Sequence, residues 1–267
     1  MRTLKNLSKR PIIGPVARHA LGHVVNFEAN RISKHFLKYM RPTIARCDNE
    51  RDVAFNIRHQ VYCEELAFEE VRAQQKERDA FDIYSTHCVM QHVASDAAMG
   101  TVRVVLPKGE AQLLPMEAHC SDFITDMSKH PKNFRRDQIC EISRLAIPKS
   151  FRRRSSDKFD GAATGGIDVS QYSQTELRCF PFVAIGLYFS AASVVAHNNA
   201  DYCYAMMEPK LAQSMRFVGI DFRQIGPAME YRGLRAPYYI PCAQFYDGMK
   251  PGLRRLCSVI SQKLEHF

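Results

Sequence analysis

Residues 140–147, CEISRLAI, alternate in a period of two, and Pro148 follows directly. This period is typical of a β-strand, which a proline commonly ends. One face is predicted to carry Cys140, Ile142, Arg144 and Ala146, and the other Glu141, Ser143, Leu145 and Ile147. Burying an acid and a base in a largely apolar strand is costly unless they form an ion pair or take part in the protein's function. Two readings stay open, a structural ion pair at a strand end and a functional site.

Similar patterns predict further strands and helices along the chain. Before the strand at 140–147, they predict a strand at 43–47, a helix from 48 to about 66, and paired strands at 87–93 and 99–106. After it, they predict strands at 202–207, 224–229 and 237–241, and helices at 209–218 and 243–264, the last broken at Pro251. The charged stretch 69–79 is expected to be a solvent-facing loop or a mobile lid, and 113–132 a region of loops or short helices that forms a pocket wall.

Two further stretches have ambiguous patterns. Residues 179–196 contain no charged side chain, which meets the length of a membrane span, but proline, glycine and serines dilute them. We therefore expect a buried helix that crosses one face of the sheet. Residues 149–173, with three consecutive arginines and several glycines, predict a flexible insert. Their glycines fit no phosphate-binding loop, and the arginines leave open a linker or a docking site for an acidic carrier protein.

Charge divides the chain into two regions. Residues 1–46 hold 10 of the basic residues and 1 acidic residue, so 10 − 1 = +9 accounts for the whole net charge of +9. We expect a basic N-terminal arm at 1–46 and one domain at 47–267. Residues 16–39 of the arm have an amphipathic helical pattern, which favours contact with an anionic membrane surface or docking on the domain. Nucleic acid is a weaker alternative, because the chain has no recognisable binding motif.

Cysteine usage indicates the compartment. The 9 cysteines include no Cys-x-x-Cys pair, which argues against a disulfide framework and against a zinc site. No metal is therefore expected. The arm lacks the apolar run of a signal peptide. These features predict a protein of the reducing cytoplasm, with peripheral contact at the inner membrane through residues 1–46 as an open alternative.

Eight polar, charged or aromatic residues between positions 58 and 144 occur in a recognisable order along the chain. They are Arg58, Tyr62, Phe68, Asp79, Asp82, Arg103, Glu141 and Arg144. The order resembles that of the acyl-homoserine-lactone (autoinducer) synthases, which runs Arg, Phe, Trp, Asp-x-x-Asp, Arg, Glu-x-x-Arg. It is more similar still to the N-acyl amino acid synthases and the acyltransferases of PEP-CTERM/exosortase systems. Tyr62 and Phe68 stand where the autoinducer synthases have Phe and Trp, in the region that receives S-adenosylmethionine, and this chain has no tryptophan.

The resemblance, together with the order of strands and helices, implies an α/β GNAT acyltransferase fold, which is one mixed sheet with helices on both faces. The resemblance also implies transfer of a fatty acyl chain from a phosphopantetheine thioester to an amine. It implies a catalytic set of Glu141, Arg144 and Arg103, and a substrate-binding set of Arg58, Tyr62, Phe68, Asp79, Asp82 and Ser143. Glu141 is a candidate general base, with a purely structural role as the alternative if an arginine pairs with it. The arginines would hold the acceptor's carboxylate or order the acidic residues, and the two aspartates would orient the ammonium group.

The same resemblance places the donor's groove between the strand at 141–148 and the strand at 202–207. With no recognisable pyrophosphate loop, acyl carrier protein is favoured over coenzyme A as donor, and no permanently bound cofactor is expected. The first hypothesis is an N-acyl amino acid synthase. The alternatives are an autoinducer synthase that uses S-adenosylmethionine and, from another class, an inactive module that binds a membrane surface.

Overall fold

A computed structural model describes residues 36–151 and 182–265. The expected arm up to residue 35, and residues 152–173 of the expected insert, lie outside them. The strands of the central sheet are β1 (Met40–Ile44), β2 (Ser85–His92), β3 (Ala98–Val105), β4 (Ile139–Ala146), β5 (Tyr202–Met207), β6 (Arg223–Gln224), β7 (Met229–Glu230) and β8 (Leu234–Pro241). Their order is β1-β2-β3-β4-β5-β8-β6, with β7 paired to β8. Every pair is antiparallel except β4 and β5, which run parallel.

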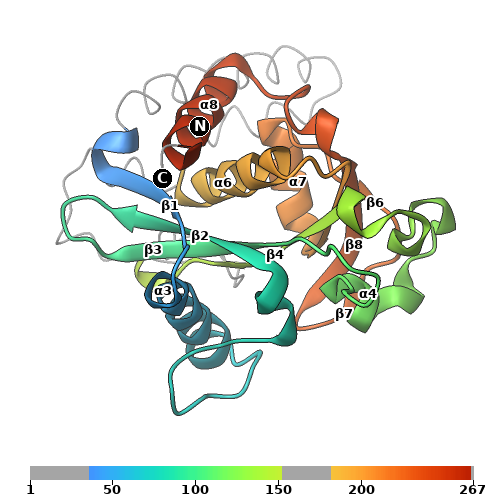
Figure 1. The fold of residues 1–267 in the computed structure, drawn as a ribbon, viewed down its shortest axis with the longest axis horizontal. Helices are drawn as coiled ribbons and strands as arrows, with labels where there is room; N and C mark the ends of the chain where they lie inside the picture. The colour runs from blue at the N-terminus through green and yellow to red at the C-terminus, as the bar shows by residue number, and fades with distance from the viewer. Residues whose placement is uncertain (1–35, 152–181, 266–267) are drawn as a thin grey trace, which may run out of the picture.

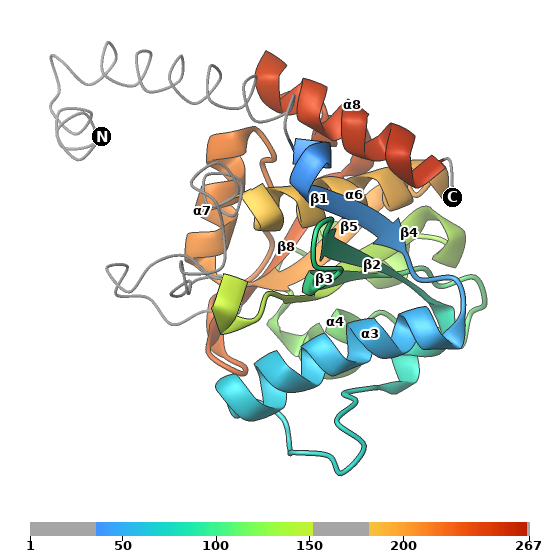
Figure 2. The ribbon, with the colours of Figure 1, turned by 90° about the vertical axis from the view of Figure 1, so that its left-hand side faces the viewer.

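Helices cover both faces of the sheet, as the sequence predicts (Figures 1 and 2). On one face lie α6 (Val183–His197) and α8 (Pro251–Glu265), and on the other α3 (Asp48–His59) and α4 (Pro115–Cys120); α7 (Pro209–Val218) follows β5. The largest apolar cluster fills the space between the sheet and α6 and α8. Because α6 is buried almost all round, it is the predicted buried helix. None of the described helices combines the length and apolarity that crossing a membrane requires.

The sheet begins earlier in the chain than predicted. The first strand is Met40–Ile44 instead of 43–47, and Phe36 and Met40 are fully buried in the core. Residues 36–46 therefore belong to the domain, and the predicted boundary at 46/47 is wrong. The proline at position 42 obscured the strand, because proline is poorly compatible with a sheet interior; here it lies in an edge strand, which tolerates it.

The C-terminal strands also differ from the prediction. Residues 224–229 do not form one strand, since β6 ends at Gln224 and β7 begins at Met229. Between them the backbone at Gly226 passes so close to Phe123 that any side chain there would collide with it. β8 begins at Leu234, earlier than the predicted 237, and thereby brings its first residues to the edge of the pocket described below.

The parallel pair β4 and β5 separates part of the way along. Its register covers only Ile139 with Tyr202, Cys140 with Cys203 and Glu141 with Tyr204. β5 nevertheless stays paired with β8 as far as Met207. The two strands therefore diverge after Glu141, at the place where the sequence predicted a groove.

Candidate active site

A β-bulge in β4 determines which side chains reach the site. Arg103 pairs with Ser143 and Thr101 with Ala146, so β4 holds one residue more than β3 between these pairs. The backbone of Arg144 takes up this extra residue with φ 51°, in the left-handed region that a non-glycine residue adopts at a cost of about 1–3 kcal/mol. Such strain persists where the surrounding structure enforces it, and it clusters at functional sites.

The bulge reverses the predicted alternation for the second half of β4. Arg144 lies on the same side as Glu141 and Ser143, so placing it on the face of Cys140 and Ile142 was wrong. Beyond the bulge Leu145 packs against the cluster under α6, on the side opposite to that predicted. An acid and a base of the Glu-x-x-Arg sequence thus come to line one pocket.

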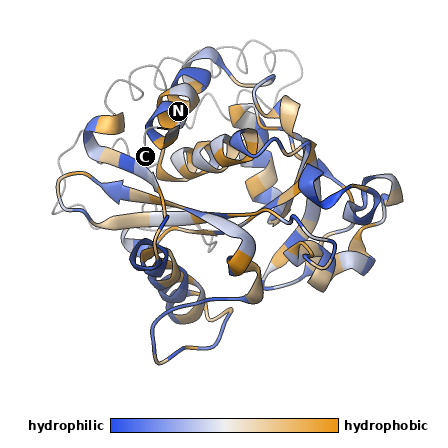
Figure 3. Cartoon of the chain, viewed as in Figure 1, coloured by the Kyte–Doolittle hydropathy of each residue, from blue (hydrophilic) through white to orange (hydrophobic). Residues whose placement is uncertain are grey.

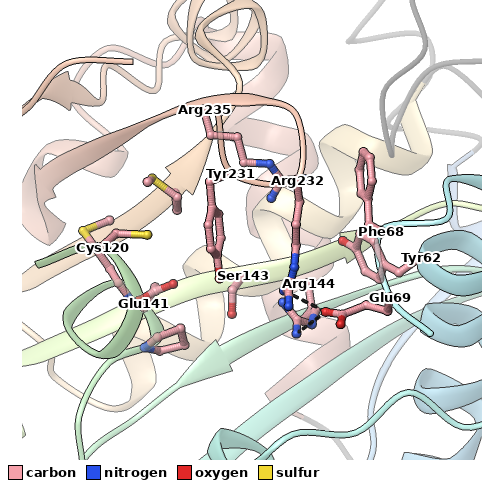
Figure 4. A pocket seen from close by; sticks show the side chains of 13 residues that line it. Tyr62, Phe68, Glu69, Cys120, Glu141, Ser143, Arg144, Tyr231, Arg232 and Arg235 are labelled. Carbon is pink, nitrogen blue, oxygen red and sulfur yellow. Dashed lines mark hydrogen bonds and ion pairs between the residues drawn. The ribbon is translucent and has the colours of Figure 1, made fainter. Parts of the chain in front are cut away.

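The pocket lies on the α3 and α4 side of the sheet (Figure 4). Its lining comprises Tyr62, Phe68, Glu69, Pro115, Met116, Cys120, Glu141, Ser143, Arg144, Met206, Tyr231, Arg232 and Arg235. Five of the nine predicted site residues are in this set: Tyr62, Phe68, Glu141, Ser143 and Arg144. Residues of α4 contribute, which confirms that part of 113–132 forms a pocket wall.

Glu141 is buried in this pocket without a cation bonded to it among the described residues. Its side chain is 1% exposed, and its Oε2 accepts a hydrogen bond of 2.8 Å from the backbone N–H of Met116 in α4. Burial raises the pKa of Glu141 to about 7, against the lowering effect of that hydrogen bond. A carboxyl group that titrates near neutrality in a pocket has the acidity that general-base catalysis requires.

The other four predicted site residues form an ionic cluster behind the pocket. Arg58 and Arg103 are both 0% exposed, and each donates to Asp82 Oδ1 over 2.7 Å. Arg103 also pairs with Asp79 and donates to the Ser143 hydroxyl over 3.1 Å. These contacts support the second of the two roles expected for the arginines, which is to order the acidic residues.

Glu77 and Glu69 complete the cluster, and the sequence did not single out either. Glu77 is fully buried and pairs with both Arg58 and Arg144, while Glu69 bridges Arg144 over 3.2 Å and Arg232 over 2.7 Å (Figure 4). Burial alone would raise the pKa of Glu77, but the charges of Arg58 and Arg144 outweigh it and lower that pKa to about 2. The same balance, dominated by Arg58, holds the pKa of Asp82 far below its usual range.

This cluster also attaches the 69–79 loop to the domain. The loop is largely hydrophilic (Figure 3), yet Glu69 and Glu77 bind Arg144 near its two ends, and the Glu77 N–H donates to Phe55 O. Between α3 and the loop, a π-helical turn at Gln60–Glu65 carries Tyr62 to the bulge. π-Helical turns frequently mark functional sites.

Tyr62 fixes the bulge, which gives a first prediction. Its hydroxyl donates a 2.7 Å hydrogen bond to the carbonyl oxygen of Leu145, next to Arg144. Tyr62→Phe removes this donor from a partly buried carbonyl and should lower the free energy of unfolding by about 0.5–1.5 kcal/mol in urea denaturation. Tyr84→Phe is the matched control, because it removes the same kind of bond, to Leu113 O, at an exposed place. Equal effects of the two variants would contradict a special role for the Tyr62 hydroxyl.

Comparison with known families now identifies the class of protein. Residues 57–159 match the model of the acetyltransferase (GNAT) domain, and this segment contains the pocket's β4 residues and the whole ionic cluster except Arg232. This segment is a GNAT acetyltransferase domain, and the GNAT fold and the acyltransferase class predicted from the sequence are confirmed at this level. No curated protein matches the chain at a significant level.

Solved structures of similar fold include members of the families that the sequence resembles. FeeM, an N-acyl amino acid synthase from uncultured soil microbes, is 17% identical with a TM-score of 0.51, over 79% of this chain and 94% of that chain. TofI, solved in a ternary complex with an inhibitor and MTA, is 14% identical with a TM-score of 0.56, over 80% of this chain and 99% of TofI. BjaI, a CoA-dependent acyl-homoserine lactone synthase, is 13% identical with a TM-score of 0.54, over 83% and 89%. At these identities the likeness establishes the shared fold.

Proposed function

We propose that this protein transfers a fatty acyl chain from a phosphopantetheine thioester to the amino group of an amino acid and so forms an N-acyl amino acid. One observation carries the proposal. A buried carboxyl group, Glu141, faces a pocket at the point where β4 and β5 separate, and its pKa of about 7 suits proton abstraction. The similar fold of an N-acyl amino acid synthase supports the choice of acceptor.

The reaction follows from this arrangement. The pantetheine arm would lie between the diverging β4 and β5, with the thioester carbon near Glu141. Glu141, directly or through one water molecule, takes a proton from the acceptor's ammonium group, and the free amine attacks the thioester carbonyl. The resulting tetrahedral oxyanion collapses and the C–S bond breaks. The amide forms as the nitrogen loses its second proton and the leaving thiolate takes up a proton, so that one proton stays with Glu141 and the other leaves as the thiol's. Arg144 and Ser143 line the same pocket and would place the acceptor for attack.

Acyl carrier protein is the donor that we propose, with coenzyme A as the alternative. An acyl carrier protein is acidic, and the N-terminal 46 residues of this chain carry its entire net charge of +9. Opposite charges accelerate the encounter of two proteins and select the partner. The donor's phosphopantetheine group is a substrate, so the proposal requires no resident cofactor.

The proposal is tested with purified protein, an equimolar mixture of amino acids, and palmitoyl thioesters of acyl carrier protein and of coenzyme A. Mass spectrometry is expected to detect N-acyl amino acids with the wild type and with Asp52→Asn, whose carboxylate lies outside the pocket, but not with Glu141→Gln. If S-adenosylmethionine is added and acyl-homoserine lactone with methylthioadenosine forms in their place, the alternative autoinducer reaction is correct. Equal product from all three proteins would contradict the role of Glu141.

A further inference from the structure

Arg235 is a cationic side chain of the pocket that has no bonded counter-charge within the described residues. It extends from β8, and its Nε is buried and lacks a hydrogen-bond partner among residues 36–151 and 182–265. Its guanidinium carbon lies 5.9 Å from the centre of the Phe68 ring, which limits its orientation. A buried donor that is left unsatisfied at a pocket is costly in the free protein, and a ligand that accepts its hydrogen bond removes that cost.

The neighbouring arginines differ from Arg235 in their counter-charges. Arg58 and Arg103 each also have one buried nitrogen without a hydrogen-bond partner in the described part of the chain, but both guanidinium groups bind carboxylates. The four arginines of the cluster are Arg58, Arg103, Arg144 and Arg232, and their partners are the four carboxylates Glu69, Glu77, Asp79 and Asp82. The charges of this set cancel. Arg235 therefore adds positive charge to a pocket whose own remaining acid, Glu141, is largely protonated below pH 7. An anion is the ligand that this charge favours.

We infer that Arg235 binds the carboxylate of the acceptor, and that the acceptors are α-amino acids with a free carboxylate. The inference rests on the proposed function and deepens it. In an α-amino acid the carboxylate and the amine are attached to the same carbon, so the two must bind close together. Arg235 on β8 and Glu141 on β4 line one pocket from different strands, and this allows one ligand to meet both (Figure 4).

A second anion in the reaction is the phosphate of the donor's phosphopantetheine group. It lies a full pantetheine arm from the thioester carbon, whereas the acceptor's carboxylate lies beside the reacting amine. Because Arg235 shares a pocket with the proposed base, the carboxylate is the ligand that fits its position. The two sources make different kinetic predictions, since one affects the acceptor's KM and the other the donor's KM.

The test compares steady-state kinetics of the wild type, Arg235→Met and Arg235→Lys, with the amino acid that mass spectrometry identifies and with its neutral carboxamide. A charge-assisted contact is worth about 1.5–3 kcal/mol, so Arg235→Met should raise the acceptor's KM about 10- to 100-fold and leave the donor's KM unchanged. The carboxamide should be a poor acceptor for the wild type, and Arg235→Met should not raise the KM for the carboxamide further. Arg235→Lys keeps the charge, so its acceptor KM should lie between those of the wild type and Arg235→Met. If Arg235→Met fails to fold, the comparison of Arg235→Lys with the wild type is the test.

Arg216→Met is the matched control, because Arg216 forms an exposed ion pair with Asp221 away from the pocket. An unchanged acceptor KM in both Arg235 variants, or a rise in the donor's KM only, would overturn the inference while N-acyl amino acids still form and the proposed function stands. If the wild type acylates no amino acid at all, the proposed function fails, and the inference fails with it.

Discussion

Glu141→Gln is expected to lower kcat for amide formation by about two to four orders of magnitude, the usual contribution of a general base. Glutamine has nearly the same shape, and its carbonyl oxygen can still accept the hydrogen bond that the Met116 N–H donates to Glu141. It cannot take a proton from the acceptor's ammonium group. The acceptor's KM should change little, because the loss concerns the chemical step. Rapid-quench or steady-state kinetics with mass-spectrometric detection measures both quantities.

The same substitution should stabilise the folded protein at alkaline pH. The pKa of Glu141 rises from 4.5 to about 7 on folding, so between these values the folded protein holds a proton that the unfolded chain releases. Stability therefore falls as pH rises from 4.5 to about 7 and then levels off, at a cost of up to about 3 kcal/mol from a shift of this size. Glutamine has no such cost, and thermal unfolding at pH 8 should show a higher Tm for the variant.

Activity and stability thus depend on pH in opposite directions. The wild type should gain kcat as pH rises through about 7, where Glu141 loses its proton, while its Tm declines relative to Glu141→Gln over pH 4.5 to 7. If the kcat profile shows no transition near neutrality, or if Glu141→Gln keeps most of the wild-type kcat, Glu141 is a scaffold residue and another group removes the proton.

The sequence predicted the elements well where periodicity and burial agree. The strand at 202–207 and the helix at 209–218 have the predicted bounds, since each has a clear pattern and a distinct start or end. The order of eight residues along the chain also picked out residues that lie together, because four of them line the pocket and the other four form the ionic cluster behind it. Local pattern and the order of residue types along the chain were sufficient for this much.

What the sequence did not predict depends on contacts across the fold. A bulge inserts one residue without leaving a mark on hydrophobic alternation, so the side of Arg144 could not be predicted from β4 alone. Glu77 lies in a stretch so charged that exposure was the natural expectation, yet arginines from α3 and β4 surround it. Arg232 and Arg235 come from a hairpin 88 and 91 residues after Arg144, at no fixed spacing from the Glu-x-x-Arg sequence.

The charges at the site divide into two groups with different roles. In the paired group, Arg58, Arg103 and Glu77 are fully buried and the aspartates partly buried, so its ion pairs fix the positions of β3, α3 and the 69–79 loop. The second group has no ion-pair partner among the residues that the structure describes, and consists of one acid, Glu141, and one base, Arg235, both at the pocket. Neutralising the first group is expected to destabilise the fold, whereas neutralising the second is expected to lower activity without destabilising it. Variants of the two groups should therefore be separable by measuring stability and activity together.

Glu77→Gln is the variant that should damage folding most. It removes the negative charge of the fully buried carboxylate that Arg58 and Arg144 share, and breaking a buried ion pair from one side costs about 3–5 kcal/mol. Asp82 and Asp79 still pair with these arginines, which favours the lower end of that range. A loss of about 3 kcal/mol corresponds to a fall in Tm of about 6–12 °C for a domain of this size, measurable by calorimetry.

The effect of Glu77→Gln should depend on pH in a defined way. The pKa of Glu77 falls from 4.5 to about 2 on folding, so its contribution is fully present above pH 4.5 and is lost as pH falls towards 2. The difference in Tm between the wild type and Glu77→Gln should accordingly shrink over that interval. Asp52→Asn provides the control, because its carboxylate pairs with Lys76 and Arg78 near the surface, where ion pairs contribute little. A loss of Tm from Asp52→Asn as large as that from Glu77→Gln would mean that burial of the cluster does not determine its contribution to folding.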